Sequence, residues 1–169
     1  MKRNLIFLDM FDFEKVIYPD VISSGGLGPC IAVGFYNSKL KEGYMVHEPC
    51  FHDSKSLDRI INSIKSDGTN LNDLTVYATG NSISCYDDET QKKYNLADRV
   101  YVESVLKSFF SKSQLTIKWA KKDTTSELYL DTLKEQFLLQ TISNKELFTG
   151  NYTRLYSSDE FTLNLPQSL

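Results

Sequence analysis

The apolar and polar residues of this chain alternate in short runs bounded by turn residues, which is the pattern of β-strands. Two such runs open the chain, at residues 4–9 and 16–23. The later runs predict strands at residues 30–36, 43–47, 74–78, 115–119, 127–130 and 136–142. The chain up to residue 142 is therefore predicted to be rich in β-strands.

Two stretches have helical spacing instead. In the first, which Asp53 or Ser54 is predicted to cap, apolar residues recur at i, i+3, i+4 and i+7. These residues are Leu57, Ile60, Ile61 and Ile64. In the second, Asn95 is the predicted cap. Its apolar face would carry Val102, Val105, Leu106 and Phe109. We therefore predict an α+β fold of layered sheets, mixed or antiparallel, with two amphipathic helices packed outside.

The chain has 169 residues, which is enough for one compact domain with a substantial core. Residues 1–142 contain all the strongly patterned runs, and we expect them to form this domain. From residue 143 onward the sequence is polar and is interrupted by single Phe and Tyr residues. Residues 143–169 are predicted to be a C-terminal extension that packs on the domain or is partly flexible.

Composition narrows the classes of function. The net charge of −3 argues against nucleic acid or an anionic membrane as the partner. The apolar run at residues 5–8 is too short for a signal peptide or a membrane span. Three Cys residues without scaffold spacing favour a reducing, cytoplasmic location. The glycines near residue 26 precede a strand and lack a phosphate-binding Lys, so no cofactor is expected.

The candidate chemistry lies on a predicted hairpin. If residues 30–36 and 41–47 pair antiparallel about a turn between Ser38 and Lys39, Cys30 faces His47 across the ladder. Directly opposed residues have Cβ atoms roughly 4.5–5.5 Å apart, which is within reach for a thiol and an imidazole. A neighbouring imidazolium lowers the pKa of a thiol and so favours the nucleophilic thiolate.

The loop before Cys30 meets a second chemical requirement, a site for a developing oxyanion. Its glycines tolerate positive φ, which allows successive N–H groups to converge on one point. These glycines are Gly25, Gly26 and Gly28. Pro29 has no N–H, so the N–H of Cys30 is the expected donor. Ser24 has a hydroxyl that can bond either ring nitrogen, and we expect it to orient the imidazole of His47.

Three consecutive features resemble the CheD family of chemoreceptor glutamine deamidases. They are the loop Ser24-Gly25-Gly26-Leu27-Gly28-Pro29-Cys30, the strand Ile31-Ala32-Val33-Gly34, and His47 seventeen positions after the Cys. Members of that family carry a Thr-Leu-Gly-Leu-Gly-Ser-Cys type loop, an apolar strand, and a His at the same spacing. The likeness extends over about residues 16–141 and is specific only in its first part. This chain departs from the pattern with Ser24 for Thr, with Pro29 for Ser, and in the bend at 122–126.

The resemblance implies a cytoplasmic protein-glutamine deamidase. Cys30 would be the nucleophile, His47 the general acid and base, and Ser24 the residue that holds the imidazole. Gly25, Gly26 and Gly28 would form the oxyanion loop, with no metal. The implied substrate is a chemoreceptor or another glutamine-bearing protein, and the implied further partner is a regulatory phosphatase.

Two alternatives stay open. His47, Cys50 and His52 lie within six residues and, with Cys30, have the ligand types of a zinc site. The same layered fold also resembles that of laccase-like cysteine hydrolases with a metal site. The second alternative is a binding module of this fold without activity, which docks to a receptor or regulatory protein. Aromatic residues in the stretch 148–161 would then be contact residues.

Overall fold

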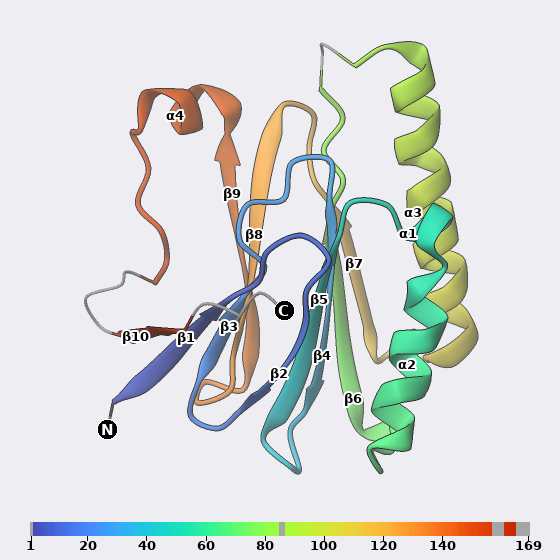
Figure 1. Ribbon diagram of the computed structural model, residues 1–169, viewed down its shortest axis with the longest axis vertical. Coiled ribbons are helices and arrows are strands. Elements are labelled where there is room, and N and C mark those ends of the chain that lie inside the picture. The colour runs from blue at the N-terminus through green and yellow to red at the C-terminus, as the bar shows by residue number, and fades with distance from the viewer. Residues whose placement is uncertain (1, 85–86, 157–160, 165–169) are drawn as a thin grey trace.

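The computed structural model describes residues 2–84, 87–156 and 161–164, and its elements form three layers (Figure 1). Two five-stranded sheets pack face to face, and helices cover the outer face of one of them. Both sheets contain parallel and antiparallel neighbours. The predicted α+β class with mixed sheets and two amphipathic helices outside is confirmed.

The first sheet, which we call sheet A, has the order β10-β1-β3-β8-β9. Its strands are β1 (Arg3–Phe7), β3 (Val21–Ser23), β8 (Thr124–Asp131), β9 (Gln136–Ser143) and β10 (Phe161–Asn164). β1 is parallel to both of its neighbours, whereas β8 and β9 run antiparallel. Strands from both ends of the described chain therefore lie side by side.

The second sheet, sheet B, has the order β2-β5-β4-β6-β7. Its strands are β2 (Phe13–Ile17), β4 (Ile31–Asn37), β5 (Glu42–Glu48), β6 (Leu74–Gly80) and β7 (Leu115–Trp119). Neighbours are antiparallel except β6 and β7, which are parallel. β7 has the predicted bounds, and it forms one edge of the sheet.

The single strand predicted at residues 16–23 is wrong. The chain instead forms β2 and β3, which belong to different sheets. A turn at Tyr18 and Pro19 separates them. Because proline has no N–H and a fixed φ, it cannot continue a ladder through this point.

The helices are α1 (Phe51–Ser54), α2 (Ser56–Ser66), α3 (Glu89–Phe109) and α4 (Asn144–Thr149), with a short 3₁₀ turn η1 (Leu71–Asp73). α2 and α3 bury their apolar stripes against sheet B, as the spacing predicts. The predicted start of α3 at Asn95 is wrong, because Asp88 caps the helix by accepting from the Gln91 N–H. The first turns of α3 are polar, so apolar spacing gives no signal for them.

Among the described residues the core has three clusters, two of which lie on the two faces of sheet B. Between sheet B and the helices lie residues such as Phe35, Val76 and Leu106. Between the two sheets lie Met45, Leu128 and neighbouring side chains, and Cys30 belongs to this second group. Each large apolar side chain that is fully buried contributes about 1.5–3 kcal/mol, so these interfaces hold the layers together.

Residues beyond 143 contact sheet A. Ser143 and Glu146 form a capping box at the start of α4. Tyr156 is buried, and its hydroxyl donates to the Asp131 carboxylate at 2.6 Å. Its ring packs against Tyr129 and Phe161. No helix within the described part of the chain has the length and apolar character to cross a membrane.

Candidate active site

Cys30 and His47 lie on the same face of sheet B, but not directly opposite each other. His47 faces Ala32 in the β4–β5 ladder, so the predicted pairing of Cys30 with His47 is wrong by two positions. A shift of two keeps every side chain on its face. Cys30 is therefore the diagonal neighbour of His47, a relation in which separations are about 7–8 Å.

The turn between the strands explains the shift. It spans residues 38–41 instead of centring between Ser38 and Lys39. The side-chain oxygen of Asn37 accepts from the backbone N–H groups of Lys39 and Leu40, at 3.0 and 3.1 Å. Lys41 takes a positive φ of 53° to close the turn. A side-chain bond of this kind favours the longer turn and moves the register.

The imidazole of His47 is buried. The residue is 4% exposed, and neither ring nitrogen has a hydrogen-bond partner among the described residues. Burial lowers its pKa, while the Asp9 carboxylate and the nearby Leu8 and Ser24 carbonyl groups oppose that decrease. The ring is therefore neutral near pH 7, and it can accept a proton from an incoming group.

The segment between β1 and β2 covers this histidine. The Phe11 N–H donates to the His47 carbonyl at 2.7 Å, and the His47 N–H donates to the Asp12 carbonyl at 3.0 Å. Met10 and Phe11 on this segment are 50% and 69% exposed. Phe11 lies on the α2 side of sheet B, where it lines a hollow with Val46 and Ile60, so its ring does not cover the imidazole.

Cys30 is 6% exposed, and burial raises the pKa of its thiol, with a further increase from the Asp98 carboxylate. Its sulfur has no hydrogen-bond partner in the part of the chain that the structure describes. Burial also raises the pKa of the Cys50 thiol. Cys85 lies outside the described residues. Cys30 is thus a neutral thiol in this structure, not the preformed thiolate that the sequence predicts.

The glycine loop leaves backbone donors unused. Leu27 pairs with Ser126 in both directions, which fixes the middle of the loop against β8. Gly25 has a φ of +64°, and its N–H donates to the Ser23 hydroxyl. The remaining N–H groups donate to no described residue. They belong to Gly26, Gly28 and Cys30.

Ser24 is close to His47, but its hydroxyl does not bond the imidazole. The hydroxyl donates to the Gly25 carbonyl and accepts from the Leu128 N–H, each at 2.9 Å. The group of Ser24 that affects the imidazole is its backbone carbonyl. In this arrangement Ser24 holds the glycine loop against β8.

Three residues without a functional signal in the sequence fix the position of the Cys30 backbone. They are Gly80, Asn81 and Arg99. The Asn81 N–H donates to the Cys30 carbonyl at 2.7 Å, and Arg99 donates to the Asn81 side chain at 2.9 Å. Gly80 has a φ of +105°, and a Cβ there would lie 2.2 Å from the Cys30 carbonyl oxygen. No local sequence pattern indicates this contact with Cys30.

The residues of the zinc alternative do not gather into a site. His47 contacts the β1–β2 segment, while the His52 N–H donates to Asp98 at 2.6 Å. Cys50 also approaches Asp98, with 3.9 Å between Sγ and Oδ1. Within the described ranges, no group of three or more His, Cys, Asp or Glu side chains is close enough to hold a metal ion.

Comparison with family models gives no match to this chain, and no curated protein matches it. The likeness to the CheD deamidases therefore depends on residues 24–47 and on their arrangement. That arrangement puts a thiol, an imidazole and a glycine loop at one end of the interface between two sheets.

Proposed function

We propose that this protein hydrolyses the side-chain amide of glutamine in a protein substrate, with Cys30 as the nucleophile. One observation carries the proposal. His47 is buried on the sheet face that it shares with Cys30, and neither of its ring nitrogens has a hydrogen-bond partner among the described residues. Burying a polar group without a hydrogen bond costs about 1–3 kcal/mol, so such a group is expected where a reaction needs it.

The directions of the two pKa shifts define the first step. The thiol of Cys30 and the imidazole of His47 are both neutral at rest. His47 therefore takes the thiol proton as the sulfur attacks the carboxamide carbon of glutamine. The negative charge that develops on the amide oxygen is stabilised by N–H groups of the loop, for which Gly26, Gly28 and Cys30 have free donors.

The remaining steps return the enzyme to its starting state. The protonated His47 gives its proton to the departing nitrogen, which leaves as ammonia, and a thioester to Cys30 remains. His47 then takes a proton from water, whose oxygen attacks the thioester carbon. The thioester bond breaks, the sulfur regains a proton from His47, and the product is glutamate. The imidazole of His47 thus carries out every proton transfer of the cycle.

The near-complete burial of the Cys30 thiol favours a narrow, unbranched side chain as the substrate group. The thiol is almost fully covered, so a bulky group or a peptide backbone would require large movements of the sheets. Met10, on the segment next to His47, is exposed and suits contact with a protein surface. A cytoplasmic location, a chemoreceptor substrate and a regulatory phosphatase partner form the finer part of this proposal.

Mass spectrometry on defined substrates tests the reaction. Cytoplasmic fragments of chemoreceptors and other glutamine-bearing proteins are incubated with the enzyme, and both ammonia release and amide-to-acid conversion are measured. Cys30→Ala and His47→Ala are expected to remove activity, whereas Cys50→Ala is the matched control and should retain it. Conversion that persists in Cys30→Ala would exclude this mechanism.

A non-catalytic binding module of the same fold is the second candidate. The nearly complete burial of Cys30 and its raised pKa favour it, because an inert structural thiol has these properties. This candidate predicts that a receptor or regulatory protein binds the wild type and Cys30→Ala equally well. It also predicts no conversion of any glutamine in the bound partner.

A further inference from the structure

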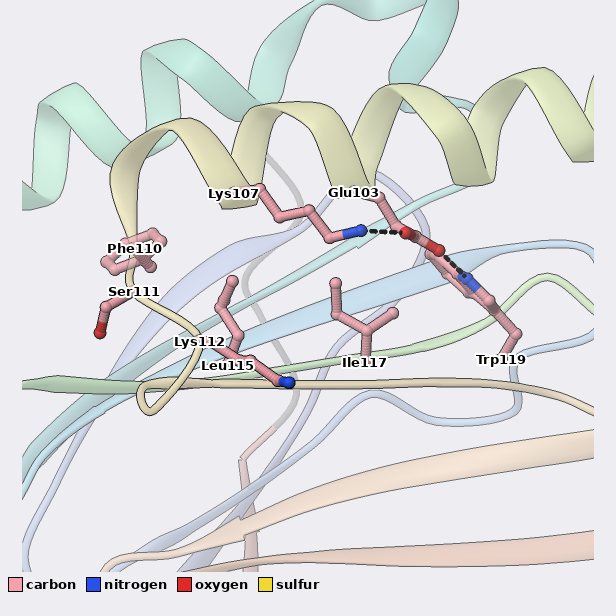
Figure 2. A pocket seen from close by; sticks show the side chains of 8 residues that line it. All are labelled: Glu103, Lys107, Phe110, Ser111, Lys112, Leu115, Ile117 and Trp119. Atoms are coloured by element: carbon pink, nitrogen blue, oxygen red, sulfur yellow. Dashed lines mark hydrogen bonds and ion pairs between the residues drawn. The ribbon is translucent and has the colours of Figure 1, made fainter.

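A groove of about 640 Å³ opens between α3 and β7, on the face of sheet B opposite to Cys30 (Figure 2). Its apolar lining comes from Phe110, Leu115, Ile117 and Trp119. The side chains of β7 alternate between partly buried and exposed, and the partly buried ones point into this groove. α3 does not close over these side chains, which stay partly exposed.

The backbone of β7 is also open on one side. The ladder bonds on its β6 side run from the Val76 N–H to the Gln114 carbonyl and from the Ala120 N–H to the Gly80 carbonyl. In a parallel pair, alternate residues of a strand turn their backbone groups to the neighbour. The backbone groups that face the open edge therefore belong to residues 115, 117 and 119. An edge of this kind can accept a further strand.

Four of the positively charged side chains around this edge form no ion pairs with carboxylates of the described residues. Four lysines here are exposed, and none forms an ion pair with another described residue. They are Lys112, Lys118, Lys121 and Lys122. The one carboxylate in the groove, Glu103, already accepts from the Lys107 ammonium at 2.6 Å and from the Trp119 ring N–H at 2.8 Å. Lys112 lines the groove, Lys118 lies on the exposed side of β7, and Lys121 and Lys122 follow the end of the strand. Basic side chains thus flank the β7 edge in a chain whose net charge is −3.

We propose that the β7 edge and this groove bind an acidic, extended segment of a partner protein, which adds to sheet B as a strand. Main-chain hydrogen bonds would join it to β7, its apolar side chains would enter the groove, and its carboxylates would pair with the lysines. A second copy of this chain fits less well, because the same lysines would meet one another. Nucleic acid fits less well because the groove lining is mainly apolar.

Fluorescence anisotropy with labelled peptides of about six residues, the length of an ordinary strand, tests the proposal. The probe peptide alternates Ile with Asp, and its control alternates Ile with Lys. We expect only the acidic peptide to bind. Lys118→Glu combined with Lys121→Glu should weaken binding at least about tenfold, because it reverses two charges beside the β7 edge. The matched control, Lys2→Glu with Lys65→Glu, makes the same charge change elsewhere and should bind as the wild type does.

Hydrogen exchange supplies a second measurement. Bound acidic peptide should slow exchange of the amides of residues 115, 117 and 119, while those of 116 and 118 are already in the β6 ladder. Cys30→Ala should bind the peptide normally, so failure of the proposed enzyme would leave this result unchanged. The proposal is overturned if neither peptide binds, if both bind alike, if the charge variants behave the same, or if single-stranded RNA binds more tightly than the acidic peptide.

Discussion

Gly80 offers the most direct test of how the fold positions Cys30. Its φ of +105° lies where other residues are strained, at a cost of about 1–2 kcal/mol. In addition, an added Cβ would lie 2.2 Å from the Cys30 carbonyl oxygen, which is a backbone atom and cannot rotate away. Overpacking of this kind costs about 1–3 kcal/mol. Gly80→Ala should therefore reduce the free energy of unfolding by about 2–5 kcal/mol.

Urea denaturation of two variants separates the contributions. Gly68 also has a positive φ, +87°, but no atom lies within 4 Å of its added Cβ. Gly68→Ala should thus show only the backbone cost of about 1–2 kcal/mol. The difference between the two variants measures the contact with Cys30. If both lose the same stability, Gly80 does not pack against the Cys30 backbone as described, and the reasoning fails.

Three further changes should have measurable effects. Burial raises the pKa of the Asp131 carboxyl. Hydrogen bonds from Tyr156 and the Lys134 N–H, together with the Arg3 guanidinium, lower that pKa by more, so the net shift is a decrease. Wild-type stability in urea should therefore fall as the pH drops below about 4, and Asp131→Asn, less stable at pH 7 by about 3–5 kcal/mol, should show a smaller fall, because the contribution of this carboxylate is missing; parallel pH curves would contradict this. Alkylation of Cys30, followed by mass mapping, should be slow near pH 6 and should increase only above the usual thiol pKa of about 8.5. In Asp98→Asn the inflection should move to lower pH, because the carboxylate raises the pKa of that thiol; an unchanged profile would show that Asp98 does not act on Cys30.

Sequence patterns were sufficient for elements whose contacts follow a regular period. The stripe of α2 and the bounds of β7 are examples, since burial on one face imposes the spacing. They failed where a single side chain changed the local geometry. Asn37 lengthened the hairpin turn, and Asp88 began α3 in a polar stretch. β10 was missed because its partner β1 is far away in the sequence.

The candidate site was predictable in its members but not in its contacts. The spacing of Cys30 and His47 correctly indicated a shared sheet face, because a shift by an even number preserves it. The partner of the Ser24 hydroxyl is the Leu128 N–H, which comes from a strand more than a hundred residues later. Nothing in the local sequence around Ser24 indicates that partner. The protonation states of Cys30 and His47 depend on burial and on contacts with distant strands. These contacts exist only when the two sheets have assembled.

The position of β1 inside sheet A has a consequence for synthesis on the ribosome. β1 is synthesised long before its outer neighbour β10, which covers residues 161–164. The free hydrogen-bonding edge of β1 stays available to other chains until that segment has been translated. Completion of this sheet therefore follows the synthesis of its other strands, and the nascent chain is most exposed to aggregation before it occurs.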